Sequence, residues 1–359
     1  FGRLPLRKGR DNMNNVFIVP TGNIIKEYLS EYGITQKELA NRMNISEKHI
    51  SNVLKGKSRL TEEFALKLEK ILTGTTASYW LNYETKYRED LARKEETLKI
   101  RDLDLEEISR RFRFKEVFKG LDISLIDQAI EMLKLLKISD FHSFESVYEN
   151  ININFMEDGG EKEAIAIWLN LCEEEIEIQN SDIDSIQYTE VELRSNLKKF
   201  KLLSNNNVTA SSIDSARRLC NKLGIYLVVC PTITNSKVRG ALTTYKKHPT
   251  IYISERYRSH SNTWFALAHE IGHLLCHYQK DDTLISYENE EINDKEKEAN
   301  EFARDFFIDP IKYEAFVQRT EYLPNDIKKF AKEQGTLPEF VVARLQHDQK
   351  IGHDKYNYL

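Results

Sequence analysis

The most informative hydrophobic pattern in the chain lies over residues 262–278, NTWFALAHEIGHLLCHY. Its apolar side chains fall on nearly every side of a helix, which predicts a helix that is buried all round. Three polar residues interrupt this pattern: His269, Glu270 and His273. Because a buried polar group without a partner costs about 2 kcal/mol or more, we expect these three side chains to serve a ligand.

A second pattern, over residues 16–92, consists of short amphipathic segments separated by tight turns. Thr35 and Ser46 stand where a side chain caps the start of a helix, and Gly56 ends the helix expected over residues 47–55. Two short helices joined by a tight turn are the helix-turn-helix arrangement that enters the major groove of DNA.

Polar and basic side chains lie on the outer face of this helix pair. Asparagine can hydrogen-bond a base edge, and lysine and arginine suit phosphates, although the solvated face of a small helical bundle shows the same pattern. The spacing alone therefore leaves both interpretations open. The candidate DNA contacts are Gln36, Ser46, Lys48, His49, Asn52, Lys55, Lys57 and Arg59.

The remainder of the chain changes from helical to mixed periodicity after residue 207. Residues 93–194 predict a helical connector, in which a helix around residues 125–136 has a clear apolar face. An α+β domain follows, and its order places the 262–278 helix against a small sheet. Its predicted elements are a helix over residues 211–223, a buried strand over 225–230, and a hairpin of strands 240–245 and 250–254.

Composition narrows the class of protein. The 359 residues are 40% hydrophobic and 30% charged, which is typical of a soluble chain with two or three domains. The four cysteines are scattered and are expected to be buried thiols in a reducing, cytoplasmic compartment. The first 60 residues hold 11 Lys+Arg against 5 Asp+Glu, whereas the whole chain has a net charge of −5, so we expect nucleic-acid contacts from the head alone.

The spacing His269-Glu270-Ile271-Gly272-His273 is an H-E-x-x-H motif. Helical positions four apart share a face, so both imidazoles can bind one ion, and two of the usual four zinc ligands are supplied. Glu270 lies about 100° around the helix from His269, where a general base for a water molecule is needed.

The third ligand does not come from an extended three-histidine motif, because Gln279 stands at the position of the third histidine. His277 is expected to have a packing role or to contact a ligand rather than the ion. A carboxylate from the helix expected over residues 294–308 is the better source. Glu298 is favoured there, next to the predicted inner face, with Glu296 as a competitor.

Two family resemblances add to this reading. GITQKELANRMNISEKHISNVLKGKSRLTEEFALKLEKIL, followed by YWLN at residues 79–82, resembles the Cro/XRE-type helix-turn-helix of HigA-like antitoxins over residues 16–92. This resemblance implies homodimeric binding to double-stranded operator DNA, with autoregulation beside a toxin. It also implies that Trp80 is a core residue.

ISERYRSHSNTWFALAHEIGHLLCHY, followed by KEKEANEFARDFFIDP, resembles the ImmA/IrrE family of zinc metallopeptidases. The resemblance extends from about Leu193 into the tail and implies a zincin-like domain, a Zn²⁺ cofactor and Glu298 as the third ligand. Members of that family cleave helix-turn-helix repressors. Departures at Ser254 and at residues 306–310 leave the choice of substrate open.

The sequence thus predicts a basic, disordered leader (1–15), a DNA-binding domain (16–92), a connector (93–194) and a zinc peptidase domain with a helical tail (195–359). Glu270 is the expected base, and a substrate is expected to add as a strand beside residues 250–254. Candidate substrate or transition-state residues are Tyr252, Arg344 and His347.

Two alternatives remain for the metal domain. In the first, the protein is a non-proteolytic HigA-like antitoxin or repressor whose metal domain is a sensor or partner-binding module. In the second, the zinc is structural, which requires a fourth protein ligand from His277 or Cys276.

Overall fold

The computed structural model describes residues 19–148, 160–256, 259–280, 283–287, 294–319 and 321–359. The chain forms two compact units, and the division falls between Glu107 and Ile108. The expected leader lies outside the described residues. The segment expected as a connector belongs partly to each unit, because everything after Glu107 groups with the sheet.

The first unit is entirely helical in its described part. The buried Trp80 is at the centre of its core, as predicted, and its indole N–H donates to Thr75 Oγ1 at 3.0 Å. Thr35 Oγ1 and Ser46 Oγ accept hydrogen bonds from backbone N–H groups at 3.1 and 3.2 Å, which confirms both predicted helix caps. The helices are α1 (Thr21–Glu31), α2 (Gln36–Met43), α3 (Glu47–Leu54), α4 (Glu62–Ile71) and α5 (Ala77–Arg101).

Helix α5 fixes the loop that follows α3. Glu84, although buried, accepts hydrogen bonds from the backbone N–H of Leu60 at 3.2 Å and from Arg88 Nε at 2.7 Å. Arg88 also donates to the carbonyl oxygens of Gly56 and Ser58. These bonds hold the basic segment between α3 and α4 in a defined path.

The second unit contains a four-stranded sheet with the order β1-β3-β2-β4. β1 (Tyr226–Cys230) runs parallel to β3 (His248–Ser254), and β3 pairs antiparallel with β2 (Val238–Tyr245), which confirms the predicted strand and hairpin. β4 (Leu284–Tyr287) pairs antiparallel with β2. No strand was predicted from the sequence over these residues.

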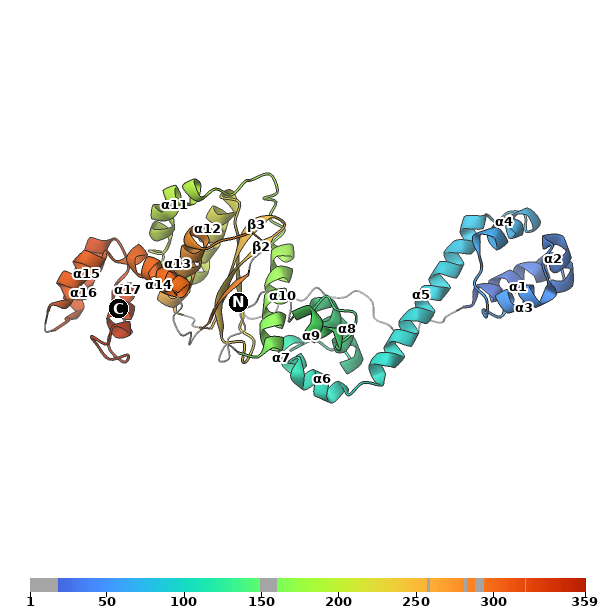
Figure 1. The fold of residues 1–359 in the computed structure, drawn as a ribbon, viewed down its shortest axis with the longest axis horizontal. Coiled ribbons are helices and arrows are strands. Elements are labelled where there is room, and N and C mark those ends of the chain that lie inside the picture. The colour runs from blue at the N-terminus through green and yellow to red at the C-terminus, as the bar shows by residue number, and fades with distance from the viewer. Residues whose placement is uncertain (1–18, 149–159, 257–258, 281–282, 288–293, 320) are drawn as a thin grey trace. The chain divides into compact units, whose positions relative to one another are not determined.

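Helices cover both faces of this sheet (Figure 1). α10 (Lys162–Gln179) packs on one face, where the Trp168 ring contacts Tyr252 edge to face at 6.2 Å. α12 (Thr209–Lys222) and α13 (His260–Cys276) lie on the other face and share one hydrophobic core with the sheet. The predicted buried helix is therefore α13.

The remaining helices surround these layers. They are α6 (Leu105–Arg111), α7 (Phe114–Val117), α8 (Leu125–Leu135), α9 (Ser143–Tyr148), α11 (Glu190–Leu203), α14 (Asp294–Phe307), α15 (Pro310–Val317), α16 (Pro324–Gln334) and α17 (Pro338–His347). Within the described residues, none of the helices has the length and apolar content that a membrane span requires. Three of the cysteines are buried as expected, but Cys276 is exposed at the end of α13.

Gly22 of α1 lies close to the backbone at the end of α3. A Cβ atom placed there would lie 2.2 Å from the carbonyl oxygen of Leu54 at the end of α3. We predict that Gly22→Ala destabilises the helix-turn-helix by about 1–3 kcal/mol through overpacking, despite the better helix propensity of alanine. Amide hydrogen exchange of peptides from the full-length chain measures this change.

The matched control is Ser30→Ala, an exposed position on the same helix. It should leave exchange protection unchanged within error. Equal protection in Gly22→Ala and the wild type would show that α1 and α3 are not in this close contact.

Candidate metal centre and nucleic-acid interface

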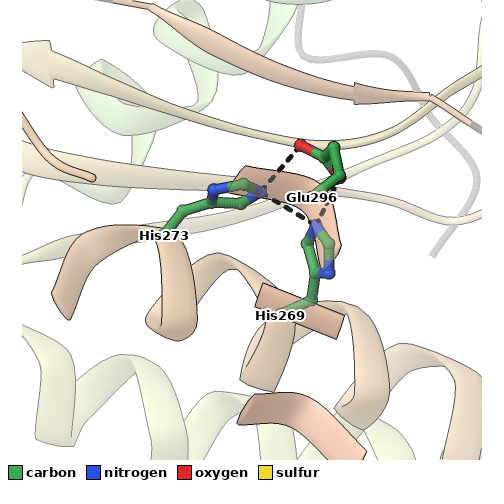
Figure 2. Close-up of side chains that lie close together, drawn as sticks. All are labelled: His269, His273 and Glu296. Carbon is green, nitrogen blue, oxygen red and sulfur yellow. Dashed lines mark hydrogen bonds and ion pairs between the residues drawn. The ribbon is translucent and has the colours of Figure 1, made fainter. Parts of the chain in front are cut away.

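The two motif histidines of α13 point their Nε2 atoms at a common point (Figure 2). The Nε2 atoms of His269 and His273 are 3.0 Å apart, and both side chains are buried. The third group at this point is the carboxylate of Glu296 on α14. Its oxygens lie 3.1 Å from His269 Nε2 and 2.9 Å from His273 Nε2.

Glu296 replaces Glu298, which the sequence favoured as the third ligand. The buried positions of α14 include Ala299, Ala303 and Phe307. At about 100° per residue, Glu296 lies on this buried face, whereas Glu298 lies more than 90° away from its centre. The Glu298 side chain is 62% exposed and contacts His277 instead. The prediction of Glu298 was therefore wrong, because it counted Phe302 and Phe306 with Ala299 and Ala303 on the inner face, whereas both phenylalanines are only partly buried.

Other polar side chains orient the two imidazoles. Asn300 Oδ1 lies 3.1 Å from His269 Nδ1, and this contact keeps the proton on Nδ1 and frees Nε2 to bind an ion. His273 Nδ1 lies 3.1 Å from His277 Nδ1, and His277 Nε2 lies 3.0 Å from Glu298. His277 thus supports His273, as expected, and Glu298 supports His277.

Glu270 is buried between α13 and the sheet. Both carboxylate oxygens lack a hydrogen-bond partner among the described residues. A Cβ atom on Gly240 of β2 would lie 2.4 Å from Glu270 Oε1, so a larger residue at this point of the strand would displace the carboxylate. Burial raises the pKa of Glu270, and the Glu296 carboxylate adds to this effect against the two imidazoles.

The charges of the site are coupled. Burial alone would lower the pKa of His273, but the contacts with Glu296 and Glu270 outweigh it and raise this pKa. Burial alone would raise the pKa of Glu296, but its hydrogen bonds to the two imidazoles hold it well below the usual range. The three side chains form a compact group with one carboxylate, which is the donor chemistry that a divalent metal ion requires.

The geometry fits zinc. Two nitrogens bound to one tetrahedral zinc ion at 2.0–2.1 Å would be roughly 3.3 Å apart. The observed separations among the two imidazole nitrogens and the two carboxylate oxygens, 2.9–3.1 Å, are close to this value. Within the described residues, His269, His273 and Glu296 form the group of side chains that could hold a metal ion. Cys276 is exposed and His277 turns to His273, so neither completes a closed site.

The structure does not bring the three candidate substrate residues to this centre. Tyr252 lies on the sheet face opposite α13, where burial holds its pKa well above the usual value. Arg344 Nε donates to Asp348 at 2.7 Å, and its guanidinium lies over the Tyr313 ring. His347 contacts Asp348 and is largely exposed. These positions do not support the roles suggested for Tyr252 and Arg344, whereas His347 lines a pocket that also includes Ala266 of α13.

The expected site of strand addition is also wrong. β3 is an inner strand that pairs with β1 on one side and β2 on the other, so residues 250–254 have no free edge. β4 is the strand beside the metal-binding group, since Ser286 Oγ lies 3.2 Å from His269 Nε2. β4 has only four residues and lies in a polar stretch of sequence. Its hydrophobic pattern is therefore too short to predict a strand.

The candidate DNA contacts lie at the ends of α2 and α3 and in the loop beyond α3. Gln36, Lys48, Lys55, Lys57 and Arg59 are exposed. The other candidates also have structural contacts: the Ser46 hydroxyl caps α3, His49 lies 6.0 Å from the Phe64 ring, and Asn52 is half-buried.

Comparison with known proteins agrees with both units. Residues 25–80 match the helix-turn-helix family model, and residues 220–346 match the IrrE N-terminal-like domain, a peptidase family. Over 79 residues the chain is 35% identical to the uncharacterized HTH-type transcriptional regulator YddM of Escherichia coli strain K12. The match covers 22% of this chain and 81% of that protein.

Fold and site thus define a helix-turn-helix regulator joined to a metallopeptidase-type domain. The chain belongs to the Cro/XRE-type helix-turn-helix transcriptional regulators, and it carries an IrrE N-terminal-like domain.

The sequence predicts Glu298 as the third ligand, whereas the structure has Glu296 in this position. Substitutions of the two glutamates distinguish these assignments. We predict that Glu296→Gln weakens zinc binding by about 100-fold or more, because loss of a ligand exceeds the effect of losing a supporting contact. Glu298→Gln should weaken it by about tenfold at most, since Glu298 acts through His277. A competition titration with a chromophoric chelator measures both affinities.

The two substitutions are chemically identical and two residues apart, so each is the control for the other. Zinc binding that is lost in Glu298→Gln and kept in Glu296→Gln would refute the assignment of Glu296.

Proposed function

We propose that the protein is a DNA-binding transcriptional regulator whose C-terminal domain is a zinc-dependent endopeptidase. Its target would be a regulatory protein, such as a repressor or a toxin–antitoxin partner. The head would bind operator DNA as a homodimer. The family matches support the two activities, and the arrangement around Glu270 carries the proposal of catalysis.

Glu270 is the observation that favours catalysis over a structural or sensory metal site. A buried carboxylate without a partner destabilises a fold by about 3 kcal/mol or more. Ligand binding by His269, His273 and Glu296 does not require this carboxylate. A site that only held an ion would be more stable with an apolar side chain at position 270, so its retention next to Gly240 points to chemistry.

The residues of the site would have two different roles in hydrolysis, metal binding and proton transfer. His269, His273 and Glu296 would hold Zn²⁺, which supplies Lewis acidity toward a peptide carbonyl and a water molecule. Glu270 would accept a proton from the attacking water at a carboxylate oxygen and then donate it to the nitrogen of the leaving amine. Burial raises the pKa of Glu270, which favours acceptance of a proton by this carboxylate.

The substrate would lie along β4. Within the described residues, β4 pairs only with β2, so its other edge can bind an extended peptide through main-chain hydrogen bonds. Ser286 of β4 is already in contact with His269, which places this edge at the metal-binding group.

We predict that Glu270→Gln lowers the cleavage rate by about 10²–10⁴-fold, the usual contribution of a general acid–base. Zinc affinity should change little, and the unfolding midpoint should not fall, because the substitution removes a buried charge. Incubation of zinc-loaded protein with a host-cell lysate, followed by mass spectrometry of new N-termini, measures cleavage.

Glu301→Gln, an exposed glutamate on α14, is the control and should cleave like the wild type. New N-termini that form equally with Glu270→Gln would exclude Glu270 as the base. Zinc binding without any cleavage by the wild type would favour the non-proteolytic alternative.

For the head, we predict that Lys57→Ala and Arg59→Ala each weaken binding to a promoter fragment of the protein's own gene. The loss should be similar on unrelated sequences, and each substitution should lower the salt dependence by about one unit of slope, as expected for a phosphate contact. Gel shifts over a range of salt concentrations measure this effect.

Lys67→Ala on α4, where the lysine pairs with Glu63 at 2.8 Å, is the matched control. Absence of any wild-type binding at low salt would contradict the DNA assignment.

A further inference from the structure

A basic pocket opens along α13, where Asn262 and Ala266 line it about two turns and one turn before His269. It has a volume of about 380 Å³, which is within the range of ligand sites. Its lining includes the cationic or titratable side chains Arg239, Arg256, His347 and His353, and no lining residue carries a carboxylate. The nearby Asp348 is engaged by Arg344 and His347.

Arg239 is directed to this pocket by a break in the sheet. Val238 pairs with Tyr287 and Gly240 pairs with Ser286, so Arg239 is the extra residue of a β-bulge between β2 and β4. Such a bulge re-aims a side chain. The Arg239 guanidinium lies 5.8 Å from the centre of the Phe265 ring on α13 and makes no ion pair among the described residues.

A second observation points to a ligand in the same pocket. Ser254, at the end of β3, lines the pocket and is only 8% exposed. Its Oγ has no hydrogen-bond partner among the described residues. A buried hydroxyl without a partner next to an uncompensated guanidinium is suited to a small group with acceptor atoms.

The pocket lies along the path of a substrate. Asn262 and Ala266 line it and lie within about 60° of His269 on the α13 surface. They precede His269 by seven and three residues, which corresponds to roughly 4–11 Å along the helix axis. An extended peptide advances about 3.3 Å per residue, so the pocket would receive a side chain roughly one to three residues from the cleaved bond.

We propose that this basic pocket is a specificity subsite for an acidic side chain, aspartate or glutamate, of the protein that is cleaved. The proposal rests on the proposed peptidase function. Arg239 binds the carboxylate through its guanidinium, and Ser254 can donate a hydrogen bond to it. Substrates are thereby selected by a negative charge near the scissile bond.

The main experiment is digestion of a proteome-derived peptide library by the zinc-loaded, full-length protein, followed by sequencing of the products. Wild-type products should be enriched in Asp and Glu at one position, one to three residues from the cleaved bond. A matched peptide pair with Glu or Gln at that position should differ about tenfold or more in kcat/KM, as expected for a charged hydrogen bond.

Three variants test the assignment. Arg239→Gln should remove the acidic preference, measured as the ratio of kcat/KM for the Glu and Gln peptides, and Arg239→Lys should restore part of that ratio. Lys247→Gln, which removes an exposed charge from the turn after β2, should keep the full preference. Cleavage by the wild type without an acidic preference, or a preference that Arg239→Gln leaves intact, overturns the subsite.

If the peptidase proposal fails, no cleavage is observed at all. A binding experiment tests the subsite proposal independently of cleavage. N-acetylglutamate methylamide, its glutamine analogue and inorganic phosphate are titrated into the full-length protein, and NMR signals of Arg239 and Ala266 are followed. Shifts with the glutamate derivative alone, absent in Arg239→Gln, support a carboxylate subsite. Tighter binding of phosphate, or no shift with the glutamate derivative, contradicts it.

Discussion

The close packing of α13 on α14 is the constraint on which the candidate centre depends. A Cβ atom on Gly272 would lie 3.1 Å from the Phe302 ring and 3.2 Å from Ala299 Cα, so the glycine within the H-E-x-x-H motif permits the helices to approach. At this separation Glu296 reaches both imidazoles and Asn300 reaches His269. One small residue thus lets the second helix supply both a ligand and its support.

A second close contact, between Glu270 and Gly240, determines how the proposed catalytic carboxylate is buried. The sheet comes near enough to bury the carboxylate, whose oxygens have no hydrogen-bond partner among the described residues. The adjacent residue of β2 is the bulged Arg239, so one stretch of strand both encloses the proposed base and borders the basic pocket. Placing uncompensated charges in this way lowers stability, and such violations of local rules concentrate at functional sites.

Most of the architecture could be predicted from the sequence, because local signals are strong there. Thr35 and Ser46 marked helix starts, and the hairpin and α13 followed from periodicity. The buried Trp80 was implied by the family resemblance. The third ligand could not be fixed, because Glu296 and Glu298 differ only in rotation about α14, and that rotation is set by tertiary packing. The strand order of the sheet also could not be predicted from the sequence, because β4 is short and forms only by pairing with β2.

The most direct test of the account is a crystal structure of the zinc-loaded, full-length protein with anomalous scattering recorded at the zinc edge. We expect one zinc ion at about 2.0–2.2 Å from the Nε2 atoms of His269 and His273 and from a carboxylate oxygen of Glu296, with Glu270 beside it but not bound. A zinc ion bound by Glu298, or closed off by His277 or Cys276, would contradict the account.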